Sequence, residues 1–386
     1  MPNIKLYNKI SQIGLDEFDS NKYTVSENVE SPDAILVRSA ALHEIEFNEN
    51  LLAIARAGAG VNNIPIDRCS ENGIVVFNTP GANANGVKEL AIAALLLASR
   101  DIVGGINWAL GLKGQPEVGK LVEKGKSQFV GPEIKGKTLG VIGLGAIGGM
   151  VANTGSLLGM KAVGCDPYIT VKNAWALDRS IRKADDYDAI YAESDYISYH
   201  IPSLPSTKGI INKENIAKMK DGVRIINLSR GDLANIPDLI EALNSGKVAS
   251  YVTDFPCEEL LGIPHVVCIP HLGASTPESE DNCAVMAAQQ LIDFIENGTI
   301  RNSVNYPEIQ LPRTETNRVI VLHENVPNII TQISAALASD NVNIESLLSQ
   351  AKGNNAVSIF GTNDAIVDAV VADIKAIKGV VRVIVR

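Results

Sequence analysis

Short apolar runs alternate with segments of helical periodicity over most of the chain. The runs at 34–39 ("AILVRS"), 51–58 ("LLAIARAG") and 73–80 ("GIVVFNTP") have the length and composition of buried strands. Apolar residues then recur at helical spacing and around the whole circumference of 86–100 ("GVKELAIAALLLASR"), which predicts a buried helix. Such alternation is typical of a parallel sheet covered by helices on both faces.

The pattern is interrupted once and then resumes. A stretch rich in glycine and lysine at 111–137 predicts a loop region between domains. A strand at 138–142 follows, with a glycine-rich turn, a helix and another strand behind it. Four further runs read as strands, with helical segments between several of them: 196–202, 223–229, 249–255 and 265–270. We therefore expect a second doubly wound parallel sheet, followed by a long helix over 278–298.

The last seventy or so residues have a different order of elements. A linker containing proline and threonine, 300–316, precedes a strand at 318–324 and a helix at 327–340 that begins with proline. A hairpin over 344–362, turning at 353–355, a helix over 365–377 and a closing strand at 380–386 complete the sequence. The order βαββαβ predicts a small ferredoxin-like domain.

Composition restricts the class of protein. The chain has 386 residues, 46% of them hydrophobic, and a net charge of −10, which argues against nonspecific nucleic-acid binding. Its most apolar stretch, 90–99, is about half the length of a membrane span, and the first ten residues do not resemble a signal peptide. Five cysteines without CxxC spacing predict free thiols and no metal site. We expect a cytoplasmic protein that does not bind membranes.

A dinucleotide fingerprint lies between the strand at 138–142 and the next helix. "GLGAIG" places glycines at Gly143, Gly145 and Gly148, with Ala146 and Ile147 between the last two. The first glycine permits a tight turn, the second lets the backbone approach a pyrophosphate, and the third allows close helix–strand packing. Asp166 follows the next strand, where a carboxylate accepts hydrogen bonds from ribose hydroxyls and repels a 2′-phosphate. We therefore predict NAD as cofactor rather than NADP.

Three polar residues follow successive strands of the second sheet. Arg230, Glu258 and His271 come after the runs at 223–229, 249–255 and 265–270. An arginine can bind a carboxylate, a histidine can exchange a hydroxyl proton, and a carboxylate beside the histidine would favour its protonated form. Each residue alone is also compatible with a structural role, but their order at strand ends favours hydride transfer on a 2-hydroxy acid.

"GLGAIG", "YHIPSLPSTKGII", "INLSRGDL" and "IPHLGAST" together resemble the D-isomer-specific 2-hydroxyacid dehydrogenases. The resemblance implies that Arg230 orients the substrate, that Glu258 supports His271 and that His271 is the proton donor. Alignment on Asp254 would select Glu259 in place of Glu258. The remaining positions implied to contact NAD, besides the fingerprint, are His200, Pro202, Thr207, Leu228, Ser229, Arg230, Asp254, His271, Gly273 and Ala274.

"LVRSA", "ARAGAGVNNI" and "NTPGANANG" are similar to the family members that oxidise 3-phospho-D-glycerate to 3-phosphohydroxypyruvate, the first step of L-serine biosynthesis. That similarity places seven residues around the substrate: Arg38, Ser39, Arg56, Gly58, Ala59, Gly60 and Asn83. Two alternatives stay open. One is a glyoxylate, hydroxypyruvate or other D-2-hydroxyacid reductase, and the other is an NAD-sensing binding protein or corepressor on the same scaffold.

The C-terminal segment resembles an ACT domain, a regulatory module that binds amino acids at subunit interfaces. "LHENVPNII" and "DNVNIES" supply His323, Asn325 and Asn343, which the resemblance assigns to L-serine. Asn328 stands where these modules usually have glycine, so a dimerisation module without ligand is the alternative. The expected domains are 1–98 with 285–310 for the substrate, 99–284 for NAD and 317–386 for regulation, in a homodimer or homotetramer.

Overall fold

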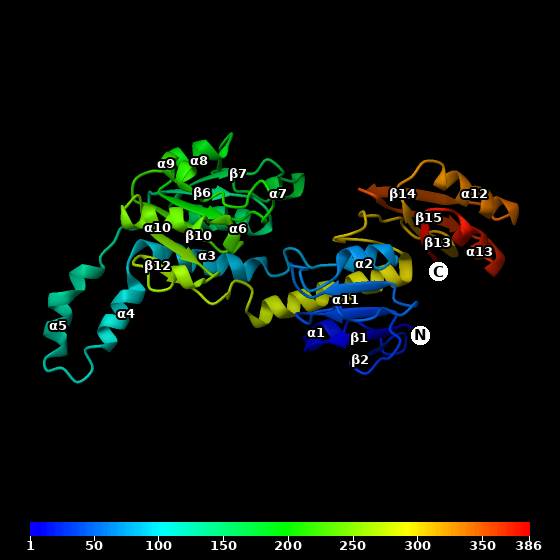
Figure 1. The fold of residues 1–386 in the computed structure, drawn as a ribbon, viewed down its shortest axis with the longest axis horizontal. Helices are drawn as coiled ribbons and strands as arrows, with labels where there is room; N and C mark the ends of the chain where they lie inside the picture. Colours follow the sequence, from blue (N-terminus) through cyan, green and yellow to red (C-terminus); the bar gives the residue numbers. More distant parts are fainter. The chain divides into compact units, whose positions relative to one another are not determined.

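The computed structural model describes all residues from Met1 to Arg386. They form two compact units, Met1–Asn83 with Pro277–Arg386 (unit 1) and Ala84–Thr276 (unit 2) (Figure 1). The five cysteines are free thiols. No helix has both the length and the apolar character that crossing a bilayer requires.

Unit 1 contains a five-stranded parallel sheet in the order β2-β1-β3-β4-β5. Its strands are β1 (Asn3–Tyr7), β2 (Thr24–Ser26), β3 (Ala34–Val37), β4 (Ala53–Arg56) and β5 (Val75–Phe77). Its helices are α1 (Gln12–Leu15), α2 (Ile66–Glu71) and α11 (Pro277–Asn297). Leu291 and Phe294 of α11 belong to the same buried cluster as Leu36 and Phe77 of the sheet. The predicted strands at 34–39, 51–58 and 73–80 are confirmed.

Unit 2 contains a seven-stranded sheet in the order β12-β11-β10-β9-β6-β7-β8, with every pair parallel. The strands are β6 (Thr138–Ile142), β7 (Lys161–Cys165), β8 (Arg182–Lys183), β9 (Tyr196–Tyr199), β10 (Val223–Asn227), β11 (Val248–Thr253) and β12 (Val266–Cys268). The helices that connect them are α6 (Ala146–Leu157), α7 (Val171–Trp175), α8 (Tyr187–Glu193), α9 (Lys213–Lys218) and α10 (Ile236–Asn244). The doubly wound prediction is confirmed, and the strand order reverses between β6 and β9, where such sheets bind ligands.

Helix α3 (Ala84–Ser99) belongs to the core of unit 2. Ala91, Leu95 and Ala98 pack in one cluster with Leu139 and Val151 of the nucleotide fold. The boundaries between the two units therefore lie directly before α3 and directly before α11. The sequence analysis placed the domain boundaries after residues 98 and 284.

The segment 111–137 was predicted as loop, and this is wrong for part of it. Helix α4 (Ile102–Leu110) is followed by α5 (Val118–Gly125) and a 3₁₀ turn, η1 (Lys126–Phe129). The Trp108 ring packs against Phe129, with ring centroids 5.4 Å apart. An added Cβ at Gly125 would lie 2.4 Å from Trp108, so the glycine is needed for the helices to meet closely. Figure 1 shows α4 and α5 (cyan) extending from the sheet of their unit.

The C-terminal module has the predicted ferredoxin-like order. Strands β13 (Asn317–Glu324), β14 (Ser346–Lys352), β15 (Asn355–Thr362) and β16 (Val380–Val385) form an antiparallel sheet in the order β14-β15-β13-β16. Helices α12 (Ile329–Ser339) and α13 (Asp368–Ala376) complete it. Helix α12 begins after Asn328, whose φ of 67° is left-handed, and so Pro327 lies outside the helix that it was expected to start.

This module shares a core with the rest of unit 1. Ile320 and Val357 of its sheet belong to the same buried cluster as Ile4 and Phe294. Arg318 is fully buried and pairs with Glu315 at 2.6 Å, and it also donates to the carbonyls of Asn297 and Pro312. In Figure 1 the C-terminal sheet (orange to red) accordingly lies beside α11 (yellow). The linker is thus held by a buried guanidinium, each of whose three nitrogens donates a hydrogen bond.

Candidate active site

The glycine-rich turn joins β6 to α6 and has the geometry expected of a pyrophosphate cradle. Gly143 has φ of 88°, and an added Cβ there would lie 2.4 Å from the carbonyl oxygen of His200. An added Cβ at Gly148 would lie 1.9 Å from the carbonyl oxygen of Gly143. A Cβ at Gly145 would meet nothing within 4 Å. The fold itself therefore needs two of the glycines, and the third keeps open the space in front of the α6 N-terminus.

Asp166 follows β7 and fixes the same turn. One carboxylate oxygen accepts the Leu144 N–H at 2.9 Å, and the other accepts the Tyr168 N–H at 2.8 Å. A carboxylate accepts about four hydrogen bonds, so both oxygens retain capacity for ribose hydroxyls. This arrangement fits the predicted role of Asp166 in binding NAD.

The loop after β9 follows one of the two strands, β6 and β9, between which the strand order reverses. His200 shares a 2.8 Å hydrogen bond with Ser198 through Nε2, and its Nδ1 is buried without a partner. Burial lowers the pKa of His200 to about 4, so the ring is neutral at physiological pH. The Thr207 hydroxyl donates to the Pro202 carbonyl at 2.6 Å, which holds the loop closed on itself. These three residues therefore shape the wall of the predicted cofactor site.

The segment after β10 presents Arg230. Leu228 is buried, and the Ser229 hydroxyl donates to the Tyr199 carbonyl at 2.5 Å. The Asn227 amide donates to the Arg230 carbonyl at 2.9 Å, which fixes the backbone at this position. The exposed guanidinium donates once, to the Ser229 carbonyl at 2.6 Å. Its other N–H groups have no protein partner and are available to a carboxylate.

Asp254 and His271 are joined through their backbones. The His271 N–H donates to the Asp254 carbonyl at 3.0 Å, and the Gly273 N–H donates to the Asp254 carboxylate at 3.1 Å. Burial raises the pKa of Asp254, although the Gly273 hydrogen bond and the charges of His271 and Arg230 partly offset this. The second Asp254 carboxylate oxygen is buried without a partner. An unsatisfied buried acceptor is costly, which suits a group that receives a donor from a bound cofactor.

The His271 side chain is exposed and has a left-handed backbone with φ of 45°. Its ring packs on Phe255, with centroids 4.8 Å apart and an interplanar angle of 53°. The sequence analysis did not single out Phe255, because an aromatic residue after a strand carries no signal of its partner. An added Cβ at Gly231 would lie 3.2 Å from Phe255, so that ring is confined on a second side.

Glu258 and Glu259 both lie on the 3₁₀ turn η3 (Glu258–Leu260) after β11. The backbone N–H of Glu259 and the Cys257 thiol donate to the Glu259 carboxylate and lower its pKa. Neither carboxylate makes a hydrogen bond or ion pair with His271 in this structure. Because Glu259 is already engaged, Glu258 is the freer partner, and its support of His271 stays a prediction.

The predicted substrate residues of unit 1 lie at the carboxyl ends of β3 and β4 or in the segments that follow β3, β4 and β5. Arg56 donates to the Arg38 carbonyl at 2.9 Å and to the Gly60 carbonyl, and an added Cβ at Gly58 would lie 3.0 Å from its guanidinium. Arg56 thus shapes the loop that contains Ala59, whereas the Arg38 side chain bonds to Glu280. The Ser39 N–H is held by Asn8 at 2.9 Å, and Asn83 directly precedes α3.

The three predicted L-serine ligands are not together in one chain. Both His323 ring nitrogens are engaged, with the Glu324 carbonyl at 2.7 Å and the Ser358 hydroxyl at 2.8 Å. Asn325 donates to the Gly353 carbonyl, at the end of the sheet where β13 finishes. Asn343 lies before β14, at the opposite end of the sheet. A ligand that touches all of them would need two copies of the module.

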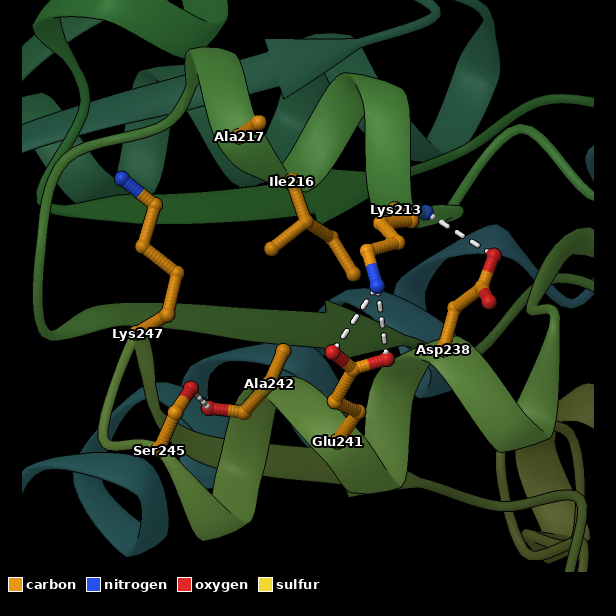
Figure 2. A pocket seen from close by; sticks show the side chains of 8 residues that line it. All are labelled: Lys213, Ile216, Ala217, Asp238, Glu241, Ala242, Ser245 and Lys247. Atoms are coloured by element: carbon orange, nitrogen blue, oxygen red, sulfur yellow. Dashed lines mark hydrogen bonds and ion pairs between the residues drawn. The ribbon is translucent and has the colours of Figure 1, made fainter.

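A cavity of about 330 Å³ opens between α9 and α10, and Figure 2 shows its lining. Lys213 bonds to both Glu241 carboxylate oxygens at 2.9 and 3.0 Å, and its N–H donates to Asp238. None of the predicted site residues lines this cavity. It is therefore distinct from the strand ends that carry Arg230 and His271.

Residues 93–273 match the family described as "D-isomer specific 2-hydroxyacid dehydrogenase, NAD binding domain". A D-3-phosphoglycerate dehydrogenase from Haemophilus influenzae is 31% identical over 355 residues, covering 88% of this chain and 82% of the relative. The chain belongs to the D-isomer-specific 2-hydroxyacid dehydrogenase family. The NAD-binding domain and the dehydrogenase family predicted from the sequence are thereby confirmed.

Several other curated relatives are longer than this chain, and a solved structure of one relative is also similar. A D-3-phosphoglycerate dehydrogenase from Archaeoglobus fulgidus is 36% identical over 291 residues, covering 72% of this chain and 52% of the relative. This chain spans between 52% and 59% of the length of three such curated relatives. The crystal structure of an NAD⁺-bound 3-phosphoglycerate dehydrogenase from Entamoeba histolytica has a TM-score of 0.61 and 28% identity, covering 79% of this chain and 98% of that one.

The contrast between Gly145 and Gly148 gives a direct test of the cradle. Gly148→Ala should destabilise the fold by about 1–3 kcal/mol, because its Cβ would overlap backbone. Gly145→Ala should leave the melting temperature unchanged but weaken NAD binding about tenfold, because its Cβ enters the space of the pyrophosphate. Thermal melts and calorimetric titration with NAD would measure both. Undiminished NAD affinity in Gly145→Ala would contradict the assignment.

Proposed function

We propose that this chain is an NAD-dependent dehydrogenase that oxidises 3-phospho-D-glycerate to 3-phosphohydroxypyruvate, the first step of L-serine biosynthesis. The observation that carries the proposal is the placement of Arg230, Asp254 and His271 at neighbouring strand ends of a sheet whose first strand leads into a dinucleotide cradle. The names of the curated relatives support the phosphorylated substrate. The open alternatives are another D-2-hydroxyacid reductase and an NAD-sensing binding protein.

His271 acts as the base in the forward direction. Its neutral ring accepts the proton of the C2 hydroxyl while the C2–H hydride departs, and the C2–O bond becomes the ketone. NAD⁺, when bound by the 143–148 turn and Asp166, supplies the hydride acceptor. In the reverse direction the protonated ring returns the proton to the ketone. Packing on Phe255 holds the ring in place, and Glu258 stabilises its charged form.

Arg230 binds and orients the substrate carboxylate. A guanidinium offers five donors in a planar fork, and only one N–H of Arg230 is used by the protein. Arg38 is the proposed ligand of the phosphate, because its side chain follows β3 and is not committed to the loop as that of Arg56 is. Ser39, Asn83 and the 58–60 loop complete the proposed substrate set.

The C-terminal module is proposed to be an ACT domain that binds L-serine between two copies. The ferredoxin-like strand order supports this, and so does the position of Asn325 and Asn343 at opposite ends of one sheet. A cytoplasmic homodimer, or a homotetramer formed through these modules, is the accompanying proposal.

Substrate preference tests the proposed reaction. The purified chain with NAD should form NADH faster from 3-phospho-D-glycerate than from D-glycerate or 2-hydroxyglutarate, because Arg38 pairs with the phosphate. The absorbance of NADH gives the kcat/KM for each. Equal values for 3-phospho-D-glycerate and D-glycerate would favour the reductase alternative, and no turnover of any acid would favour the binding protein.

The roles of the histidine and its partner can be separated by rate. His271→Ala should lower kcat about 10²- to 10⁴-fold, as expected for loss of a general base. Glu258→Gln should lower kcat by a smaller factor, because the histidine that accepts the proton is retained and only its proposed supporting charge is lost. Glu259→Gln is the matched control, since that carboxylate is engaged by Cys257. A loss of kcat in Glu259→Gln alone would reverse the assignment.

Regulation is tested by serine itself. L-serine added to the full chain should lower the initial rate and raise the melting temperature, because a ligand that binds the folded state stabilises it. D-serine is the stereochemical control. If L-serine changes neither quantity, the module serves in assembly without a ligand.

A further inference from the structure

The carboxyl ends of three neighbouring strands of unit 1 carry cations. Lys9 follows β1, Arg38 follows β3, and Arg56 ends β4. The strand order β1-β3-β4 and the register Tyr7–Val37 bring Lys9 and Arg38 to adjacent strand ends. Lys9 and Arg38 line one small cavity together with Ser11 and Glu280. Clustered cations at strand ends are arranged as for an anionic ligand.

Glu280 lies in the first turn of α11, and its side chain lines the same cavity as Lys9 and Arg38. Its carboxylate accepts a hydrogen bond from the Arg38 guanidinium at 2.5 Å, and both side chains are slightly under half exposed. The carboxylate of a neighbouring residue, Asp281, accepts a hydrogen bond from the Ser11 hydroxyl. A side-chain carboxylate therefore sits where an anionic ligand of Arg38 would bind.

The cavity beside this ion pair is small. Its volume is about 10 Å³, which is roughly the space that one water molecule requires. A phosphate that accepts from the guanidinium nitrogen now bonded to Glu280 must displace that carboxylate. An ion pair of two partly exposed side chains is weak, typically about 0–1 kcal/mol, so exchange for another anion is not costly.

Lys9 is the cation that remains available. Its side chain is exposed and makes no hydrogen bond or ion pair, although it lines the same cavity as the paired Arg38. The Lys9 ammonium is thus a second cation, besides Arg38, that an anion in this cavity can reach. A dianion can interact with both cations, whereas the single charge of Glu280 is held by Arg38 alone.

We propose that Lys9, Arg38 and Glu280 form an exchangeable phosphate subsite, in which Glu280 holds Arg38 until the substrate phosphate displaces it and Lys9 binds that phosphate together with Arg38. The inference rests on the proposed function for the identity of the substrate. It adds two specificity residues, Lys9 and Glu280. Glu280 lowers affinity for every anion at this position, and Lys9 restores it for a dianion, so the pair selects for phosphate.

Two substitutions with opposite expected effects test the subsite. The measured quantity is the kcat/KM for 3-phospho-D-glycerate divided by that for D-glycerate. This ratio should rise roughly threefold in Glu280→Gln, because the competing charge is removed. It should fall about tenfold in Lys9→Gln, because a charge-assisted contact is lost. In an Arg38→Gln background, Glu280→Gln should no longer raise the ratio, since the two side chains act on each other.

A second readout is independent of turnover. Inorganic phosphate is titrated against the melting temperature of the full chain saturated with NAD, so that the pyrophosphate cradle is filled. The half-saturating phosphate concentration should fall in Glu280→Gln and rise in Lys9→Gln by the same factors. Glu278→Gln, in the same turn of α11, and Lys378→Gln, on the C-terminal module, are the matched controls and should behave as the unaltered chain.

The two proposals can fail separately. Altered phosphate affinity without oxidation of 3-phospho-D-glycerate would retain the subsite and reject the proposed reaction. Oxidation of that substrate with unchanged ratios and unchanged phosphate affinity in both variants would reject the subsite. A fall in phosphate affinity in Glu280→Gln would also reject it, because it would show that the carboxylate supports the ligand instead of competing with it.

Discussion

Parallel pairing of strands is the constraint on which both candidate sites depend. When all strands of a sheet run the same way, every loop that follows a strand emerges at the same edge. In unit 2 this brings the fingerprint turn after β6 and the segments after β10, β11 and β12 to one edge. In unit 1 it gathers Lys9, Arg38 and Arg56. Residues that are far apart in the chain therefore become neighbours without any contact being needed to specify them individually.

Strand direction sets only the approximate positions of the loops that follow the strands, and hydrogen bonds to backbone groups fix these positions more closely. The Asp254 carboxylate accepts from the Gly273 N–H and its carbonyl accepts from the His271 N–H, while the Asp166 carboxylate accepts from the Leu144 and Tyr168 N–H groups. Asp254 and Asp166 thus each tie a loop to a strand end. A buried carboxylate oxygen is costly to leave without a donor, so these bonds help to fix the loops at the strand ends.

The C-terminal module shares its buried core with the rest of unit 1. It has the strand order of an independent ferredoxin-like unit, yet Ile320 and Val357 complete a core that includes Phe294 of α11. Arg318 anchors the connection with Glu315. Helix α11 therefore contributes to two features of unit 1, the core that it shares with the module and, through Glu280, the ion pair with Arg38.

Most elements of the fold follow from local periodicity. Runs of apolar residues at strand length, the glycine pattern at 143–148 and the hairpin at 353–355 are local signals, and they determined the two parallel sheets, the cofactor cradle and the ferredoxin-like order. Helix α5 was not predicted, because the glycines and lysines of 111–137 indicated a loop and the amphipathic segment within it is short. The contact of α5 with Trp108, which stabilises it, is not local.

The sequence by itself determined which residue types follow which strand, and hence that Arg230, Glu258 and His271 belong to one edge. Only the tertiary structure decided what those side chains touch. It placed His271 on Phe255 and paired Glu280 with Arg38. The physical reason is that strand order and direction follow from repeated local patterns, whereas a side-chain contact depends on the packing of segments distant in the chain, which no local pattern encodes.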